Sequence, residues 1–402
     1  MTELRELELV GDLADAQSMP DASGVRRGGD RRRRRARGIA AGAALAVAAV
    51  IAVPAVDGAT DRQSAPPAEN DKQGRQDAQV VRRDSGLSGW RLAHQYAVAD
   101  EGIVFAAEGS LWVADRRDGE VDPATGKPEG VLHRIDPATG LTTATVPGAV
   151  GGWPVQHDNA IWLATPSTDL LSRVDLDTLE LTTIDTSPTE QPGLRGFVFA
   201  GGWLWANNMD DGTLTRLDPR TYAITKTIDF DLPAEHDGAM PPILWHGRIW
   251  TMVQDTDEIV QVDPSAGRIV SRQTNPARNV GGALVVLRDR IAVLSGTSLT
   301  FLEVSDSGVL STGRHVDLLP GAEEDVGPLE AYGSLWLTSW SGGELVQLDP
   351  TTYAVRGRVD IPTTGPQNDV SPTTTAAYGS VWVRVFNRLL EFRPTGGSAA
   401  VR

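Results

Sequence analysis

Short apolar runs alternate with turn-forming residues along most of the chain, and one such run recurs seven times. Each copy places a large ring, or its replacement, in the middle of an apolar strand, as in GSLWVAD from Gly109 and GSLWLTS from Gly333. The equivalent positions are Trp112, Trp162, Trp205, Trp250, Ala292, Trp336 and Trp382. Their spacings are 50, 43, 45, 42, 44 and 46 residues. A period in the forties built from short strands is typical of β-propeller blades. The pattern therefore predicts an all-β, seven-bladed β-propeller over residues 90–402.

The rest of each repeat predicts four antiparallel strands. An apolar strand precedes the Trp strand across a tight turn such as Glu108-Gly109, and a third strand follows it. An aspartate that begins a turn then recurs 13 residues after the Trp, at Asp175, Asp218, Asp263 and Asp349. An Asp side chain accepts hydrogen bonds from nearby N–H groups, and a following proline presets the turn. We expect the Trp rings to fill the space between blades and these Asp residues to form turns. Ligand stacking would suit isolated residues such as Trp90 or Trp340 better.

Three segments depart from the repeat. The fifth blade has Ala292 in the Trp position and Val304-Ser305 near the turn, and we predict a degenerate blade. The first blade contains two copies of one turn phrase, VDPATG from Val121 and IDPATG from Ile135, and the first copy is predicted to be an insertion. The run from Trp90 to Val98 is a spare strand ahead of the first blade. It could complete the last blade and so remove a free sheet edge.

The first 89 residues differ from the repeats. Residues 38–56 are a run of 19 residues without a charge, which is long enough to span a bilayer as a transmembrane helix. The arginine cluster from Arg31 places the N-terminal flank in the cytoplasm. The sequence thus predicts a single-pass cell-membrane protein with an extracytoplasmic propeller. A cleaved signal peptide is the alternative.

The flanking segments are predicted to lack a core of their own. Residues 57–89 are polar and cannot bury enough surface to offset the entropy of ordering, so we expect a disordered linker. Residues 1–37 are predicted to be a mostly disordered cytoplasmic leader. Leu4 and Leu7 begin a short apolar stripe at helical spacing, which could alternatively bind a cytoplasmic regulator.

Charge and cysteine content exclude some functions. The chain has a formal net charge of −16, and all of the acidic excess follows residue 37, because residues 1–37 are slightly basic. Such a domain is a poor partner for nucleic acid, and it should be repelled by an anionic bilayer. With no cysteine in 402 residues, disulfides and thiolate metal sites are excluded.

The repeat phrases GSLWVAD and IDPATG resemble those of YVTN-type and virginiamycin B lyase-like (streptogramin lyase-like) seven-bladed propellers. The resemblance spans about residues 90–402. It implies a Mg²⁺-dependent lyase that opens a cyclic depsipeptide with a Glu and a His on the central face. None of the six histidines follows a glutamate by two residues, and the nearest arrangement is Glu235-His236-Asp237. Glu235 and His236 are therefore the weak catalytic candidates.

The candidate ligand-binding residues lie in the connections between blades. Three of these connections share a form, AEHDGAMPP from Ala234, AEEDVGPLE from Ala322 and PQNDVSPTT from Pro366. Ring symmetry would point their side chains toward a common axis, where carboxylates suit Mg²⁺ or Ca²⁺. The candidates for ligand binding are Asp237, Asn279, Glu324, Asp325 and Asp369, and those for a metal are Asp237, Asp325 and Asp369. The alternative is that each Asp only caps its own loop.

Three functions follow from these features. The first is a membrane-tethered ligand- or protein-binding or sensor module. The second is a metal-dependent enzyme of the virginiamycin B lyase type, and the third is a signalling receptor whose leader binds a cytoplasmic regulator.

Overall fold

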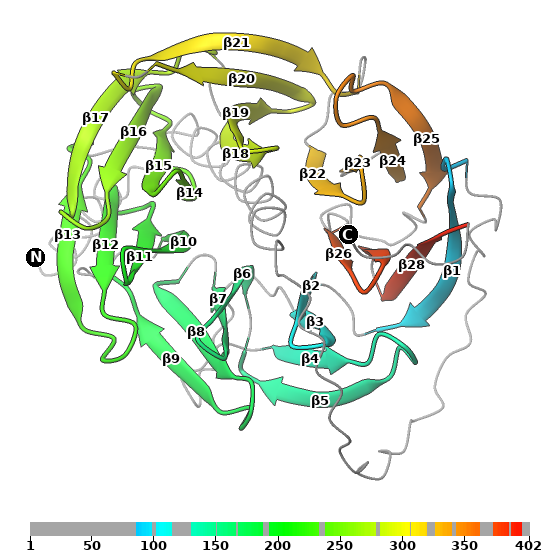
Figure 1. Cartoon of the computed structure of the whole chain (residues 1–402). Coiled ribbons are helices and arrows are strands. Elements are labelled where there is room, and N and C mark those ends of the chain that lie inside the picture. The colour runs from blue at the N-terminus through cyan, green and yellow to red at the C-terminus, as the bar shows by residue number, and fades with distance from the viewer. Residues whose placement is uncertain are drawn as a thin grey trace, which may run out of the picture. The chain divides into compact units, whose positions relative to one another are not determined.

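The computed structural model describes most of the repeat region and the four residues just before it. The described residues are 86–98, 102–114, 130–149, 151–165, 168–187, 193–232, 238–278, 282–305, 307–319, 326–339, 343–361, 373–385 and 387–395. They form seven four-stranded antiparallel sheets around a common centre, and Figure 1 shows the ring along its axis. The predicted leader, transmembrane helix and almost all of the linker lie outside these residues. The predicted seven-bladed propeller is confirmed.

Each blade runs from an inner strand a to an outer strand d, in chain order. The a strands are β2 (Ile103–Ala107), β6 (Gly152–His157), β10 (Leu194–Ala200), β14 (Ile243–Trp245), β18 (Ala283–Leu287), β22 (Val326–Ala331) and β26 (Thr373–Ala377). The b strands are β3 (Ser110–Ala114), β7 (Ala160–Ala164), β11 (Trp203–Asn208), β15 (Arg248–Val253), β19 (Arg290–Ser295), β23 (Ser334–Ser339) and β27 (Ser380–Val385). The c strands are β4 (Val131–Ile135), β8 (Leu170–Asp175), β12 (Thr213–Leu217), β16 (Glu258–Asp263), β20 (Ser298–Val304), β24 (Glu344–Leu348) and β28 (Arg388–Pro394). The d strands are β5 (Thr142–Pro147), β9 (Leu181–Asp185), β13 (Ile224–Asp229), β17 (Arg268–Thr274), β21 (Leu310–Asp317), β25 (Val355–Asp360) and β1 (Trp90–Ala97).

The spare strand closes the ring, as predicted. β1 pairs antiparallel with β28 and gives blade seven its outer strand. Just before it, Gly86 pairs with Arg358 on the outer strand of blade six. Trp90 is 7% exposed and packs edge-on against Trp336, with ring centroids 5.0 Å apart. The suggestion that Trp90 could stack on a ligand is therefore wrong, because its ring is part of the core between blades six and seven.

The repeated Trp and Asp residues have the structural roles expected of them. The six repeated Trp rings on the b strands are at most 2% exposed. In five blades the indole N–H donates to the carbonyl of the residue five positions earlier, at 3.1–3.3 Å. Asp349 Oδ1 accepts from the backbone N–H groups of Thr351 and Thr352, at 2.8 and 2.7 Å. These bonds hold the pKa of Asp349 well below its usual range, so the side chain is a charged turn former.

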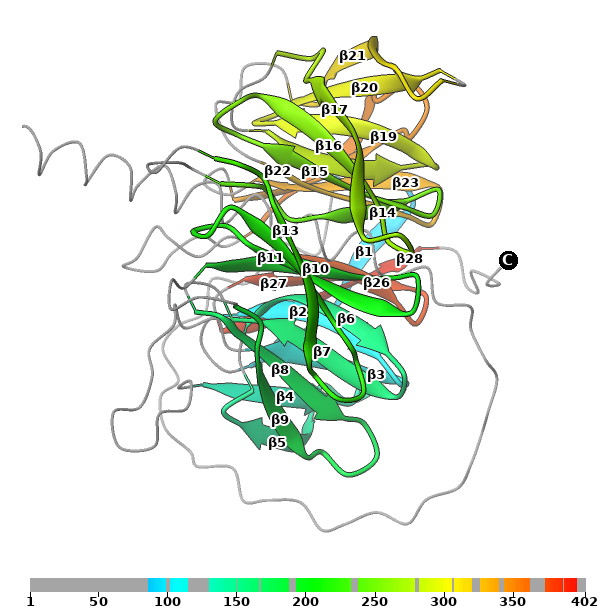
Figure 2. The same cartoon turned by 90° about the vertical axis from the view of Figure 1, so that its left-hand side faces the viewer.

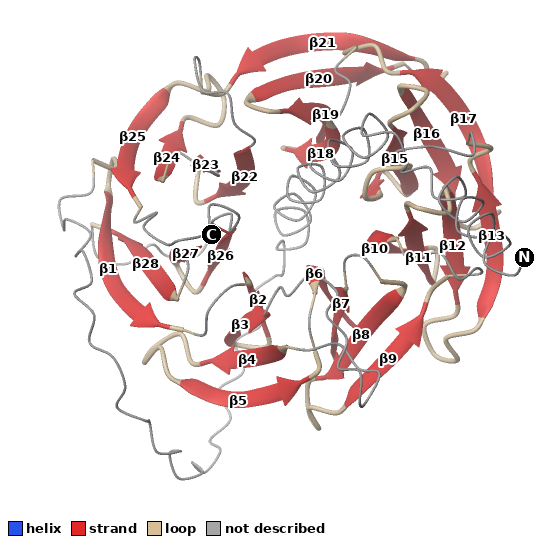
Figure 3. Cartoon of the chain, turned by 180° about the vertical axis from the view of Figure 1, so that it is seen from behind, coloured by secondary structure: helices blue, strands red, loops and turns tan. Residues whose placement is uncertain are grey.

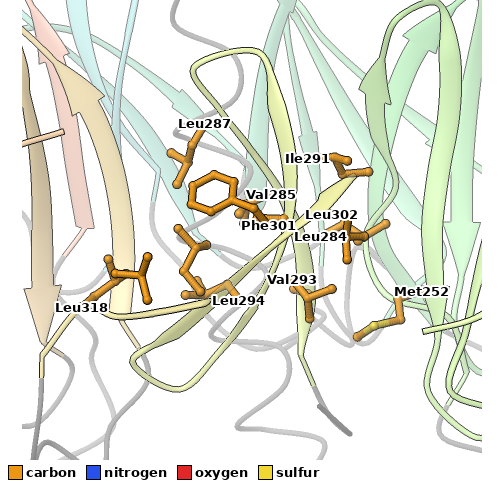
Figure 4. Packing of buried hydrophobic residues seen from close by; sticks show 14 of the residues in the cluster. Met252, Leu284, Val285, Leu287, Ile291, Val293, Leu294, Phe301, Leu302 and Leu318 are labelled. Carbon is orange, nitrogen blue, oxygen red and sulfur yellow. The ribbon is translucent and has the colours of Figure 1, made fainter. Parts of the chain in front are cut away.

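In blade five the large aromatic side chain lies on strand c instead of strand b. Ala292 is directly opposite Phe301 on β20, and Phe301 is 1% exposed among the apolar residues of this blade (Figure 4). The guanidinium of Arg290 lies 4.2 Å from the Phe301 ring centroid. An aromatic ring on strand c thus replaces the missing one on strand b, and the blade keeps a filled core.

The ring has two chemically different faces. We call the side with the a–b and c–d connections the turn face, and the side with the b–c and d–a connections the loop face (Figure 2). Every a–b connection is a two-residue turn with positive φ at both residues, for example Tyr378 (54°) and Gly379 (73°). This geometry matches the twist of paired strands. The loop face carries longer connections, most of them between strands d and a, and Figure 3 shows the seven blades from behind.

Candidate functional site

The predicted site residues all fall in connections between blades that lie outside the described residues. They are Glu235, His236, Asp237, Asn279, Glu324, Asp325 and Asp369. Whether their side chains meet therefore stays a prediction. Trp340 also lies outside the described residues.

The described part of the loop face holds a carboxylate cluster where blades two and three meet. We call Asp169, Asp185, Asp210 and Asp211 the acidic junction. Asp169 Oδ1 accepts a hydrogen bond from the Gly193 N–H at 3.1 Å. Burial is the largest cause that raises the pKa of Asp169 to about 6, and the nearby charges of Asp185, Asp211 and Asp210 add to it. The bond from Gly193 opposes that rise.

Buried polar side chains hold the acidic junction in place. The Ser187 hydroxyl donates to Asp211 Oδ2 at 2.8 Å, while its backbone N–H donates to Asp185 Oδ1 at 3.0 Å. The Thr186 hydroxyl donates to the Asp169 carbonyl at 2.9 Å. Asn208, fully buried, donates to the Thr186 carbonyl at 3.1 Å. These bonds hold Asp185, at the end of β9, and Asp169 and Asp211, in b–c connections, near one another.

The acidic junction was missed by sequence reasoning. Asp169 and the pair Asp210-Asp211 lie in b–c connections, whereas the candidates from the sequence all lie in d–a connections. The adjacent carboxylates Asp210-Asp211 were the available signal. Their distance from Asp169 depends on how blades two and three pack against each other, and a local sequence pattern does not show this packing.

The segment after the predicted Glu235-His236-Asp237 site is firmly attached to blades three and four. The amide of Asn207 donates to the carbonyls of Ala239 and Met240, at 2.7 and 2.9 Å. The Gly238 N–H donates to Asp255 Oδ2 at 3.0 Å. Gly238 has a φ of 75°, and a Cβ there would lie 2.3 Å from the Met209 carbonyl oxygen. Only glycine fits this approach, so Asp237 is followed directly by a fixed point on the loop face.

The described histidines do not form a site. His157 lies on the turn face, where its ring stacks on Phe199 with centroids 3.8 Å apart. His246, also there, lies 3.0 Å from Asp289 Oδ1. Burial lowers the pKa of His133, with a further contribution from Arg384. Within the described ranges, no group of three or more His, Asp or Glu side chains is arranged to hold a metal ion.

Beside the a–b turns, side-chain contacts reach the next blade at six of the seven junctions. They are Glu108–Gln156 (2.9 Å), His157–Phe199, His246–Asp289, the Arg288 N–H to Glu330 (3.0 Å), Tyr332 to the backbone of Gly379 and Ser380, and the Tyr378 hydroxyl to the Ser110 carbonyl (3.1 Å). Between blades three and four the turn is Gly201-Gly202, which has no side chain to reach across. Leu244, in the position of Gln156, Phe199 and Glu330, is 44% exposed there. Most side chains beside the a–b turns therefore contact the neighbouring blade.

Comparisons with known proteins identify the fold. No protein-family model matches the chain, and no curated protein matches it by sequence. Among solved structures, a streptogramin B lyase is similar with a TM-score of 0.56 and 13% identity, covering 76% of this chain and 97% of the other. Virginiamycin B lyase from Staphylococcus aureus is similar with a TM-score of 0.54 and 10% identity, covering 76% and 99%. A catalytically inactive variant of that enzyme with quinupristin gives 0.54 and 13%, with the same coverage.

At these identities the likeness shows the seven-bladed fold and nothing of the chemistry. As for the membrane, none of the described residues forms a helix that is both long and apolar enough to cross a bilayer.

Proposed function

We propose that this protein is a membrane-tethered, extracytoplasmic binding or sensor module whose loop face takes a cationic ligand or a cationic segment of a partner protein. The acidic junction carries the proposal. It fixes four carboxylates on the loop face, and one of them is buried enough to have a pKa of about 6. A nearby positive charge would favour the ionised form of Asp169, so binding of a cation is favoured there. The turn face offers less free surface, because its side chains link the blades.

We expect the sequence-predicted residues to extend this surface around the channel mouth. Asp237, Asp325 and Asp369 occupy equivalent d–a connections, and Asn279 and Glu324 lie in the same set. Oxygen ligands of this kind suit Mg²⁺ or Ca²⁺, so the proposed ligand is a hard cation or a molecule that carries a positive charge.

A thermal-shift titration of residues 58–402 with Ca²⁺ and Mg²⁺ tests the cation arm. This segment begins after the predicted span and contains every strand of the ring. A ligand of the folded state alone raises stability by about 2.7 kcal/mol at a hundredfold excess over its Kd. The rise should disappear in the triple variant Asp237→Asn, Asp325→Asn, Asp369→Asn.

A matched control separates binding from charge screening. Asp158→Asn, Asp177→Asn and Asp289→Asn remove the same number of carboxylates from the turn face and should leave the rise intact. If both triple variants lose it equally, the ions act by screening a domain of high negative charge. Capture of a partner that Asp169→Asn releases would support the protein-binding arm.

The second candidate is a metal-dependent enzyme of the virginiamycin B lyase type, which the shared fold favours. This chain lacks the Glu-x-His pair that the resemblance implies, so the catalytic candidates would be Glu235 and His236. Turnover of a cyclic depsipeptide with Mg²⁺, lost in Glu235→Gln and His236→Ala, would favour the enzyme. Absence of turnover in the unaltered protein would rule out this activity.

A further inference from the structure

The turn face carries a basic and partly apolar surface where blades three and four meet. We call Arg216, Arg220, Lys226 and Arg268 the basic sector. Blade three supplies the first three residues, and its side chains reach blade four. A Cβ on Gly267 would lie 2.9 Å from Lys226 Cδ and 3.3 Å from Arg216 Nη1. The sector therefore forms one continuous surface over the gap between the two blades.

Apolar side chains accompany these charges. The Arg216 guanidinium lies 4.4 Å from the ring centroid of Trp203. Ile224 and Leu244 are 41% and 44% exposed. Aromatic and aliphatic groups beside basic side chains are typical of surfaces that sit at a lipid–water interface.

The carboxylates near the basic sector are occupied in local structure. Asp218 Oδ1 accepts from the N–H groups of Arg220 and Thr221, at 2.8 and 3.2 Å. Asp263 Oδ1 accepts from the N–H groups of Ser265 and Ala266, and its other oxygen pairs with Arg248. At the opposite ends of the same two blades lie Asp210, Asp211, Asp255 and Asp257. Blades three and four are therefore basic toward the turn face and acidic toward the loop face.

The chain enters the ring on the far side from the basic sector. Gly86 pairs with the outer strand of blade six, and β1 lies across the ring from β13 and β17 (Figure 1). An attachment at this rim favours neither face by itself. Near an anionic bilayer, the uneven charge would decide which face turns inward, because the acidic ends are repelled and the basic sector is attracted.

We propose that the turn face lies against an anionic lipid bilayer, with the basic sector in contact with headgroup phosphates and the loop face directed away from the membrane. The net negative charge of the domain opposes its adsorption to such a bilayer, and the basic sector is the part of the surface that is attracted instead. It goes beyond the proposed function, because lipid contact on the turn face does not require a ligand on the loop face.

Labels on the two faces of one blade test the proposal, and the absence of natural cysteine makes each label unique. Residues 58–402 with an N-terminal histidine tag are held on vesicles by a nickel-chelating lipid, so the test does not depend on the predicted anchor. A fluorophore is attached at Ser265→Cys on the turn face or Thr256→Cys on the loop face, both exposed. The vesicles contain a headgroup quencher in either phosphatidylcholine or equal parts phosphatidylcholine and phosphatidylglycerol.

On the anionic vesicles, quenching at position 265 should exceed that at position 256 by about fivefold or more, since each basic residue near such a surface contributes about that factor. The ratio should fall toward one on neutral vesicles. It should also fall in the triple variant Arg220→Gln, Lys226→Gln, Arg268→Gln. The control triple Arg272→Gln, Arg278→Gln, Arg358→Gln removes equal charge toward the loop face and should keep the ratio. Equal ratios on both vesicles, stronger quenching at position 256, or an equal loss in the control would each overturn the proposal.

Discussion

The buried carboxylate of Glu391 offers a sharp test of how the ring is closed. Glu391 is 0% exposed on β28. The Ser380 hydroxyl donates to its Oε1 at 2.7 Å, Arg393 Nε donates to the same oxygen, and His94 Nδ1 lies 2.7 Å from Oε2. His94 belongs to the closing strand β1, so one carboxylate joins three strands of blade seven. We expect Glu391→Gln to destabilise the propeller.

The loss of stability in Glu391→Gln depends on how far water can reach the groups that now contact Glu391. Breaking a buried ion pair by removing one charge costs about 3–5 kcal/mol when the other charge stays buried. Here the side chains of Arg393 and His94 are 42% and 48% exposed, and water can compensate part of their loss. Glutamine also keeps an oxygen that can accept from Ser380. We therefore expect a loss of about 2–3 kcal/mol in the free energy of unfolding.

Urea unfolding followed by tryptophan fluorescence measures this loss, and Glu344→Gln is the matched control. Glu344 pairs with Arg358 at 3.1 Å, with both side chains partly exposed at 32% and 48%. Pairs of this kind contribute below about 1 kcal/mol. If the two variants lose the same stability, the Glu391 contacts do not secure the closing strand and the reasoning is wrong.

Three further predictions concern the core, the closing strand and the acidic junction. Trp336→Phe should lower the free energy of unfolding in urea by about 1 kcal/mol more than Trp205→Phe does. The reason is that Trp336 loses a hydrogen bond to the Ala331 carbonyl, whereas Trp205 Nε1 has no partner among the described residues. Equal losses would contradict this. Deleting residues 86–98 should leave β28 as a free edge and cause aggregation or a lower melting temperature, whereas an unchanged melting curve would refute closure by β1. Since the folded-state pKa of Asp169 is raised to about 6, its ionisation costs stability as pH rises toward and through 6. Asp169→Asn should therefore gain melting temperature relative to the unaltered protein between pH 4 and pH 7, and a constant difference would contradict the raised pKa.

The fold was predictable because its determinants are local and repeated. The Trp strand, the Asp turn and the two-residue a–b turn each appear as short phrases, and seven copies fix the number of blades. Ring closure by residues 90–97 was also predictable, since they are a strand-like run ahead of the first blade, and β1 does pair with β28. The Phe301 replacement in blade five was not, because it depends on the register between β19 and β20.

The sequence could assign the candidate site residues to one face of the ring, but it could not predict which side chains lie close together. Alternation along each blade shows which connections share an end of the ring, so Asp237, Asp325 and Asp369 could be assigned to one side. The approach of Asp169 to Asp210 and Asp211 depends on how two blades pack, and the burial that raises the pKa of Asp169 arises from that packing. A sequence pattern reports neither quantity.

Blade packing explains the residues that conform to the repeat. Residues that depart from the repeat are therefore the ones to examine for a function. Some departures have a structural reason. Phe301 fills the space left by Ala292, and Glu391 replaces the Arg or Gln that faces the Trp in most other blades, where the closing strand supplies His94. Packing gives no such reason for two others. The acidic junction gathers like charges that repel one another, and the Gly201-Gly202 turn leaves Leu244 exposed beside basic side chains. These two lie on opposite faces of the ring, as the proposed ligand binding on the loop face and the proposed lipid contact on the turn face both require.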